Sequence, residues 1–272
     1  MHPELIELSV PEFLRGFLPD EITIYSYGTL IATGAILGYF YTAWKAKRQF
    51  NTSPDTVRSL VIFVILAAVI GGRFFYFFER PEYFFGNPGN MLSFSRSGFV
   101  FYGSLLFAIP TMLIFFKRNK IPTLPMLDIM AVTACIVHMF GRLGCFSAGC
   151  CHGIPHEGLF SVVFTNPLCK APLNTPLFPS QLASATMIFA IMLVLLYLQR
   201  IKSFDGQVFL SYIGLYALGR GILEIFRGDY QRGYVIEGLL THSQLISIFL
   251  IIGVIYFYLR LRKKSESTPE GN

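Results

Sequence analysis

Long apolar runs, separated by short polar segments, dominate the pattern of the chain. A helix needs about 20 mostly apolar residues to cross the hydrocarbon core of a bilayer, and seven of the runs approach that length. The pattern therefore predicts an all-α membrane protein in which every run is a transmembrane helix. The seven predicted spans lie at residues 27–44, 58–78, 98–116, 127–147, 181–199, 206–226 and 243–261.

The segments between these runs contain no tract rich in Gly, Ser or Pro that would indicate a linker, and no internal repeat. We therefore predict one transmembrane domain over residues 1–262 and a disordered cytoplasmic tail over residues 263–272, which are mostly polar. The N-terminus lacks a basic region followed by an apolar run, so we expect no cleavable signal peptide.

The composition agrees with the membrane class. Of all residues, 53% are hydrophobic and only 14% are charged, whereas soluble domains carry about 25% charged residues. The net charge of +6 would fit a nucleic-acid-binding protein, but the basic residues fall in short clusters between apolar runs rather than along one stripe. We therefore expect membrane lipids as partners and no nucleic acid.

The basic clusters also predict the orientation, because short cytoplasmic loops carry an excess of Lys and Arg. Every loop that follows an odd-numbered span is basic. The N-terminus is therefore expected outside the cytoplasm and the C-terminus inside. The residues that carry this signal are Lys45, Lys47, Arg48, Lys117, Arg118, Lys120, Arg200, Lys202, Arg260, Arg262, Lys263 and Lys264.

This orientation places the polar residues of the spans near one level, at the outer leaflet. An ionisable residue within a span costs a few kcal/mol, so it usually faces the bundle interior and serves function. The alternatives are a structural ion pair or an arginine whose charged end extends to the interface. The residues at this level are Tyr27, Arg73, Tyr102, Arg142, Gln181, Arg220, Glu224, His242 and Gln244.

The sixth span carries Tyr216, Arg220, Glu224 and Arg227 at intervals of four, four and three residues, which predicts a single helical face. Arg220 and Glu224 can pair, which would lower the cost of burying both charges and orient the guanidinium. A guanidinium presents a planar set of donors that suits a phosphate diester. Together with Arg142, this face predicts a phospholipid-headgroup site that opens to the outer leaflet.

A glycine- and cysteine-rich segment, residues 140–153, ends the fourth span. Its glycines allow the chain to leave a helix and to bring backbone donors close to an anion. Four cysteines lie at or beyond the outer end of the span, where an oxidising compartment favours disulfides. His152 and His156 lie nearby, but no standard zinc spacing is present, so we expect a structural disulfide in the 148–180 loop, with no metal and no cofactor. The four cysteines are Cys145, Cys150, Cys151 and Cys169.

Seven short motifs are spread over most of the chain. They are Tyr27-Gly28, Gly71-Gly72-Arg73, Tyr102-Gly103-Ser104-Leu105, Gly141-Arg142-Leu143-Gly144 with Gly153, Pro179-Ser180-Gln181-Leu182, Tyr216 with Arg220, Glu224 and Arg227, and Ser243-Gln244-Leu245. Taken together and in this order, they resemble the motifs of the prolipoprotein diacylglyceryl transferase family of bacterial inner membranes.

The resemblance implies transfer of the diacylglyceryl group of phosphatidylglycerol to the lipobox cysteine of a prolipoprotein, which forms a thioether and releases glycerol phosphate. The partners would then be phosphatidylglycerol and the prolipoprotein signal peptide, at the periplasmic leaflet of the inner membrane. We expect Arg142 and Arg220 to hold the phosphate, Glu224 to orient Arg220, and Tyr102 to relay a proton. The residues expected to bind the lipid are Tyr27, Arg73, Gly103, Arg142, Gly153, Gln181, Tyr216 and Arg220.

The sequence departs from the family pattern at four positions. Cys145 and Ala148 stand where the family usually has Asn, Cys150 where it has Glu, and Tyr102 where it often has His. The arginines are retained while polar groups are lost, so a related transferase with another acceptor is an alternative. Two other classes fit less well: a thiol–disulfide oxidoreductase would need a C-x-x-C pair, which is absent, and a lipid or anion transporter would bind nearer the midplane.

Overall fold

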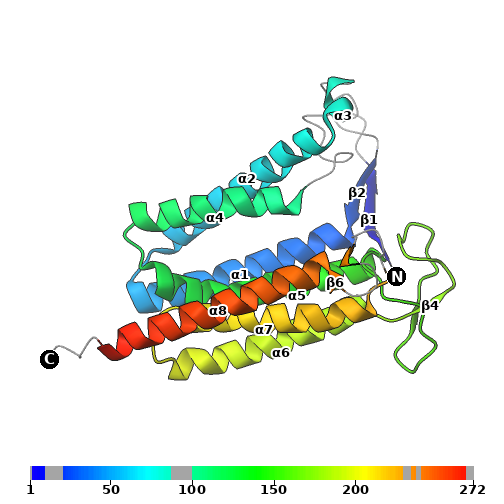
Figure 1. The fold of residues 1–272 in the computed structure, drawn as a ribbon. Coiled ribbons are helices and arrows are strands. Elements are labelled where there is room, and N and C mark those ends of the chain that lie inside the picture. Colours follow the sequence, from blue (N-terminus) through cyan, green and yellow to red (C-terminus); the bar gives the residue numbers. More distant parts are fainter. Residues whose placement is uncertain (1, 10–20, 87–99, 229–233, 237–239, 268–272) are drawn as a thin grey trace. The chain divides into compact units, whose positions relative to one another are not determined.

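In the computed structural model, residues 2–9, 21–86, 100–228, 234–236 and 240–267 are described (Figure 1). Each of the seven predicted spans coincides with a helix in this part of the chain. Serine and proline start the second of these helices, since Ser53 Oγ accepts a hydrogen bond from the Thr56 amide and Pro54 occupies the first turn. The helices are α1 (Ser26–Phe50), α2 (Pro54–Glu79), α4 (Phe101–Arg118), α5 (Thr123–Ser147), α6 (Ser180–Ile201), α7 (Gln207–Leu223) and α8 (His242–Ser267).

Five of the described helices are long and apolar enough to cross a membrane: α2, α5, α6, α8, and α7 together with the 3₁₀ turn η3 (Glu224–Phe226). The chain is therefore a mostly helical membrane protein, as its pattern predicts. One difference concerns the C-terminus, where α8 continues to Ser267, so residues 263–267 are helical rather than disordered. Residues 268–272 of the expected tail lie outside the described part.

The chain divides into two compact units. The first comprises residues 1–40 and 127–272, and the second comprises residues 41–126. In the second unit, α2 lies beside α4, and a short helix α3 (Pro81–Phe85) follows α2 (Figure 1). The two helices approach most closely at Gly71 and Gly103, where a Cβ on either glycine would collide with the carbonyl oxygen of the other. Small residues at such crossings allow the backbones of membrane helices to meet.

In the first unit, α6, α7 and α8 run alongside one another (Figure 1). The start of α7 is held by a buried carboxylate, Asp128, near the beginning of α5. Its two oxygens accept hydrogen bonds from the amides of Gly206 and Phe209, at 3.0 and 2.9 Å. Lys202 Nζ donates to the same carboxylate at 2.9 Å. An acidic group at a helix N-terminus satisfies amides that have no partner within the helix.

Three small antiparallel sheets were not predicted from the sequence. β1 (Glu4–Ser9) pairs with β2 (Glu21–Tyr25), β3 (Val162–Val163) pairs with β4 (Pro176–Leu177), and β5 (Tyr234–Ile236) pairs with β6 (Leu240–Thr241). β3 and β4 belong to the loop that joins α5 to α6, residues 148–179. This loop has its own apolar core, which consists of Phe164, Cys169, Ala171 and Leu177 packed against Phe146 and Val162.

Candidate functional site

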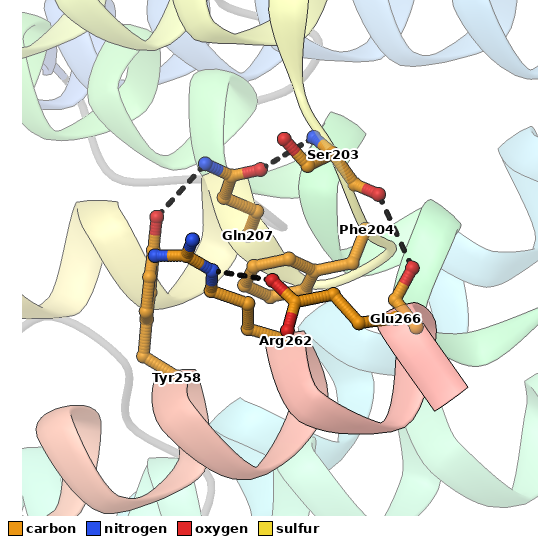
Figure 2. Close-up of a pocket in the computed structure, with 7 residues that line it drawn as sticks. Ser203, Phe204, Gln207, Tyr258, Arg262 and Glu266 are labelled. Carbon is orange, nitrogen blue, oxygen red and sulfur yellow. Dashed lines mark hydrogen bonds and ion pairs between the residues drawn. The ribbon is translucent and has the colours of Figure 1, made fainter. Parts of the chain in front are cut away.

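A cavity of about 400 Å³ lies where the end of α8 meets the loop between α6 and α7 (Figure 2). Its polar side chains bond mainly to one another: Gln207 Nε2 donates to Tyr258 Oη at 2.9 Å, and Arg262 Nε donates to Glu266 at 2.9 Å. The first of these bonds joins α7 to α8, and the second lies within α8. The α8 residues that line the cavity lie roughly 25–35 Å along the helix from its start, and the cavity contains none of the residues expected to bind lipid.

The residues expected to bind phosphate gather instead at the other end of these helices. Arg142 on α5 and Tyr216 and Arg220 on α7 surround His138, which lies on α5. Arg142 Nε donates to His138 Nε2 at 3.3 Å, and the imidazole lies 5.1 Å from the Tyr216 ring, centroid to centroid. The charge of Arg220 also acts on His138. The structure thus brings Arg142, Tyr216 and Arg220 to one place around a histidine, which we call the arginine site.

The predicted pair between Arg220 and Glu224 is confirmed. Arg220 Nη1 lies 2.5 Å from Glu224 Oε2, and the two side chains are only 12% and 6% exposed. A second contact comes from α8, where Ser243 Oγ accepts a hydrogen bond from Arg220 Nη2 at 3.3 Å. The guanidinium is therefore held from two sides, which restricts the direction in which its remaining donors point.

The prediction that Arg227 shares a helical face with these residues is wrong. The α-helix ends at Leu223, η3 follows, and Arg227 itself has an extended backbone with φ −89° and ψ 138°. Its backbone forms an isolated β-bridge with Gly153, and its side chain is buried. The chain therefore leaves the helix after Phe226, and the extended backbone at Arg227 ends the helical face on which Tyr216, Arg220 and Glu224 were expected.

Gly153 and Gln181 both serve the packing of the 148–179 loop. A Cβ on Gly153 would collide with the carbonyl oxygens of Phe178 and Phe226, so a glycine is required by this close approach. Gln181 is 1% exposed, and its Nε2 donates to the Cys150 carbonyl oxygen at 2.8 Å. The Oε1 atom of Gln181 has no hydrogen-bond partner within the described residues, so it is available to accept a hydrogen bond from a bound ligand. Lipid binding by these two residues stays a prediction.

The cysteines differ from expectation. All five are free thiols, so the predicted disulfide in the 148–180 loop is wrong for this structure. Cys169 packs in the apolar core of the loop, and Cys135 is fully buried within α5. The other three form a compact group, in which all sulfur atoms lie within 4.8 Å of one another. We call Cys145, Cys150 and Cys151 the thiol cluster.

The neighbours of Cys150 and Cys151, both beyond the end of α5, shift their pKa values in opposite directions. For Cys150, a hydrogen bond with Cys145 lowers the pKa, but hydrogen bonding with Cys151, burial and the nearby Cys151 charge together raise it. For Cys151, hydrogen bonds with Cys145 and Cys150 lower the pKa, and Arg227 lowers it further, against the effect of burial. Cys151 is therefore the more acidic of these two thiols, and it is the thiolate that acts as a metal ligand or nucleophile.

Tyr27 connects the thiol cluster with the arginine site. It lies at the start of α1 against Gly144, where a Cβ would come within 3.0 Å of Tyr27 Cδ2. The three thiols and Arg142 all act electrostatically on its hydroxyl. Because a single phenol lies within range of both groups, the thiol cluster and Arg142 belong to one region of the structure.

The remaining predicted residues lie in the second unit. Arg73 is half-buried on α2, Tyr102 is 63% exposed at the start of α4, and Gly103 is buried at the crossing of these helices. The contact with Gly71 accounts for the glycine at position 103 without a ligand. The roles of Arg73, Tyr102 and Gly103 in binding or catalysis stay predictions.

Two site residues were not singled out from the sequence. His138 precedes Arg142 by four residues, a spacing that places both on one face of α5 and that would have marked it. Ser243 was noticed only as part of a motif, and no spacing relates it to Arg220, because the contact joins two helices.

Comparisons with known proteins agree with the motifs. The sequence model of the family described as prolipoprotein diacylglyceryl transferase matches residues 17–260. The chain is similar to the phosphatidylglycerol–prolipoprotein diacylglyceryl transferase of Clostridium tetani, with 34% identity over 245 residues that cover 89% of this chain and 96% of the relative. It is 30% identical to transferase 2 of Clostridium perfringens, over 87% of this chain and 91% of the relative. A relative from Dehalococcoides mccartyi is 29% identical over 92% of this chain and 95% of its own length.

Proposed function

Since the chain belongs to the prolipoprotein diacylglyceryl transferase family, we propose that it transfers the diacylglyceryl group of phosphatidylglycerol to the lipobox cysteine of a prolipoprotein. The products are a thioether-linked lipoprotein precursor and glycerol phosphate. The observation that carries this proposal is the arrangement of Arg142 and Arg220 around His138, with Arg220 held by Glu224 and Ser243. No cofactor enters the proposal.

The two arginines can stabilise the negative charge of the departing phosphate group. When the glycerol carbon is attacked, its bond to the phosphate oxygen breaks and negative charge grows on the phosphate. Donors that are already oriented stabilise such a charge without first having to reorganise. Arg220 meets this condition, because its ion pair and its bond to Ser243 hold the guanidinium before any lipid arrives. Arg142 is the second proposed phosphate ligand, and Tyr27, Gln181 and Tyr216 are proposed to contact the rest of the headgroup. Lipid binding by Arg73, in the second unit, is a separate proposal from the sequence.

The acceptor thiol must lose a proton, because the thiolate is the nucleophile. Tyr102 is the proton relay proposed from the sequence, and His138 is a second candidate that the geometry favours. Its Nε2 accepts a hydrogen bond from Arg142, so this nitrogen is unprotonated and can take a proton when that bond is released.

We further propose that all seven long helices span the bacterial inner membrane, with the N-terminus outside and the C-terminus in the cytoplasm. The basic residues at and just beyond the C-terminal ends of α1, α4, α6 and α8 support this orientation. The arginine site would then lie at the periplasmic leaflet, where phosphatidylglycerol and the lipobox of an exported precursor meet. A non-enzymatic lipid or anion transporter is the main rival, and it would bind the lipid without consuming it.

The decisive experiment is complementation joined to an assay in vitro. The chain is expressed in a bacterium depleted of its own transferase, and lipid-modified prolipoprotein is measured by mass spectrometry. The purified chain is then incubated with phosphatidylglycerol and a lipobox peptide, and glycerol phosphate is quantified. Formation of both products supports the proposal. Lipid binding without either product would leave the family assignment in place and exclude the transferase activity with this acceptor.

A further inference from the structure

The thiol cluster has the composition and size of a metal site. The three sulfur atoms lie within 4.8 Å of one another. In a tetrahedral zinc site, Zn–S bonds of about 2.3 Å place neighbouring sulfurs roughly 3.8 Å apart. The thiols of the metal-free chain therefore need to move by only about 1 Å to reach bonding distance.

The backbone that carries these thiols is already in place. Cys145 is on the last turns of α5, and the chain then reverses through Gly149 and Cys151, which both have positive φ angles, 64° and 59°. Ser180 Oγ donates to the Cys151 carbonyl oxygen at 2.7 Å, and Gln181 Nε2 donates to that of Cys150 at 2.8 Å. A non-glycine residue with positive φ is uncommon and is kept only where its surroundings favour it. Here it turns the third sulfur towards the other two.

The chemistry of the donors selects the ion. Thiolates are soft ligands and bind zinc and copper(I) in preference to magnesium or calcium. A site of three thiolates carries more negative charge than a divalent ion neutralises, and the buried Arg227 beside Cys151 offsets part of the excess. Among the described residues, no histidine or carboxylate joins the group. A tetrahedral ion held by these three sulfurs would keep its fourth position open to another ligand, as catalytic zinc sites do.

We propose that Cys145, Cys150 and Cys151 bind a thiophilic metal ion, with zinc as the probe, and that the open position takes the sulfur of the acceptor cysteine. The second half of this proposal rests on the proposed function. The metal site lies in the region of Arg142, since Tyr27 is within electrostatic range of both groups. The acceptor sulfur and the lipid phosphate would then be held side by side.

The reaction balances without an oxidant or a reductant. On binding the metal, the acceptor thiol loses its proton to solvent or to a neighbouring base. The resulting thiolate attacks the glycerol carbon, a C–S bond forms, and the C–O bond to the phosphate breaks. The phosphate leaves with that electron pair and is held by the arginines. The thioether product carries no charge, so it binds the metal more weakly than the thiolate and can be released.

Metal binding is tested on the full-length chain in detergent. The reduced chain is loaded with zinc and desalted, and zinc is measured by elemental analysis. A second sample receives cobalt(II), and its absorption spectrum is recorded. We expect one zinc ion per chain and sulfur-to-cobalt charge-transfer bands. Cys145→Ser, Cys150→Ser and Cys151→Ser should each reduce affinity by more than the roughly 10–100-fold that loss of a supporting partner costs.

Cys169→Ser is the matched control, because Cys169 lies in the same loop but outside the thiol cluster. Thermal melting of each variant separates loss of metal from loss of fold. If the wild-type chain retains no zinc, shows no sulfur-to-cobalt bands, or loses metal equally in the Cys169→Ser variant, the metal site does not exist. A disulfide between two of the three thiols that resists reduction and prevents zinc loading would likewise exclude the metal site.

The acceptor half is tested with two lipobox peptides, one with Cys and one with Ser at the acceptor position. Only the Cys peptide should change the cobalt spectrum. An unchanged spectrum would overturn this half, as would normal diacylglyceryl transfer by folded variants of the thiol cluster, and the proposed function would survive either result. Conversely, a chain that binds cobalt and the Cys peptide but never forms glycerol phosphate would exclude the proposed function and still support the metal site.

Discussion

Arg142 and His138 lie one helical turn apart on α5, and the guanidinium Nε donates a hydrogen bond to the imidazole Nε2 over 3.3 Å. The bond has two consequences for the proposed reaction. It directs Arg142 towards the side of α5 on which Tyr216 and Arg220 of α7 lie. It also requires the accepting nitrogen of His138 to be unprotonated. An anion that draws Arg142 away would leave that nitrogen free to accept a proton.

The first prediction concerns the two arginines. Arg142→Lys and Arg220→Lys should each reduce turnover of phosphatidylglycerol by roughly a hundred- to a thousandfold, since loss of one oriented donor costs about 3–4 kcal/mol of barrier. Lysine keeps the charge but lacks the planar fork. Turnover is measured with a lipobox peptide, beside thermal melting of each variant in detergent. Arg262→Lys, at the far end of α8, should be nearly neutral. Folded Arg142 and Arg220 variants with normal turnover would contradict the proposed mechanism.

The second prediction separates the two groups that hold Arg220. Glu224→Gln removes a buried ion pair and should reduce turnover strongly, although less than Arg220→Lys does. Ser243→Ala removes one hydrogen bond of 3.3 Å to a charged group, which typically contributes about 1.5–3 kcal/mol. Melting temperatures must be compared, because an unpaired buried Arg220 also destabilises the fold. If Ser243→Ala proves more damaging than Glu224→Gln, the ion pair is not what orients the guanidinium.

The third prediction decides between the candidate proton acceptors. His138→Gln keeps a hydrogen-bond acceptor near Arg142 but cannot titrate, so it should lower turnover about a hundredfold or more. Tyr102→Phe should change turnover less, because Tyr102 is 63% exposed, whereas His138 is hydrogen-bonded to Arg142. The reverse order of effects would return the role to Tyr102.

The fourth prediction concerns stability. Asp128→Asn should destabilise the chain by about 1.5–3 kcal/mol, because Asp128 is 3% exposed and accepts hydrogen bonds from Lys202 and from the start of α7. Asp205→Asn is the control: this carboxylate is 55% exposed, and exposed pairs contribute about 0–1 kcal/mol. Unfolding is followed by denaturant titration in detergent. Equal losses in the two variants would show that the buried carboxylate does not hold α7.

The ion pairs of Lys202 also make the stability of the fold depend on pH. Burial lowers the pKa of Lys202, but its hydrogen bonds to Asp205 and Asp128 and their negative charges outweigh burial, so the pKa is raised from 10.5. A raised pKa on a cation means that the stabilisation is complete below the pKa of the unfolded chain and is lost as pH rises through the folded value. The contribution of Lys202 should therefore be constant at neutral pH and disappear only above about pH 10.5.

The fifth prediction concerns orientation. A reporter that is active only outside the cytoplasm should work when fused within residues 79–97 or 148–180, and it should be silent after Lys120 or at the C-terminus. The basic loops motivate this pattern. Activity of the C-terminal fusion would reverse the orientation and place the arginine site at the cytoplasmic leaflet.

Much of the fold could be read from the sequence, because apolar runs of near-bilayer length leave the backbone few alternatives to a helix. Each of the seven predicted spans coincides with a long helix, although α1 and α8 both continue six residues beyond the predicted end and the short helix α3 was not predicted. The small sheets were missed because strands of two to six residues give too little alternation to detect. The end of α7 was missed for another reason: periodicity continues through Arg227, and only the backbone shows that the helix gives way to a 3₁₀ turn.

The site was predicted where one helix supplies both partners and missed where distant segments meet. Arg220 and Glu224 are four residues apart, so their pairing follows from helix geometry. The thiol cluster joins a helix to the turn that follows it, and its compactness depends on the positive φ angles of Gly149 and Cys151. Four cysteines in an oxidising compartment favour a disulfide, but their number does not predict the backbone conformation of that turn.

The loop that carries the thiol cluster is held through its main chain. Ser180 and Gln181 bind the carbonyl oxygens of residues 151 and 150, which are atoms that every amino acid possesses. During evolution, residue 150 can therefore be exchanged without loss of the anchoring bonds, and residue 151 can be exchanged among those types that tolerate a positive φ. Mutations there can change the chemistry beside Arg142 while the fold and the arginines stay as they are. A position of this kind allows an enzyme family to acquire a new way of activating its acceptor in one or two substitutions.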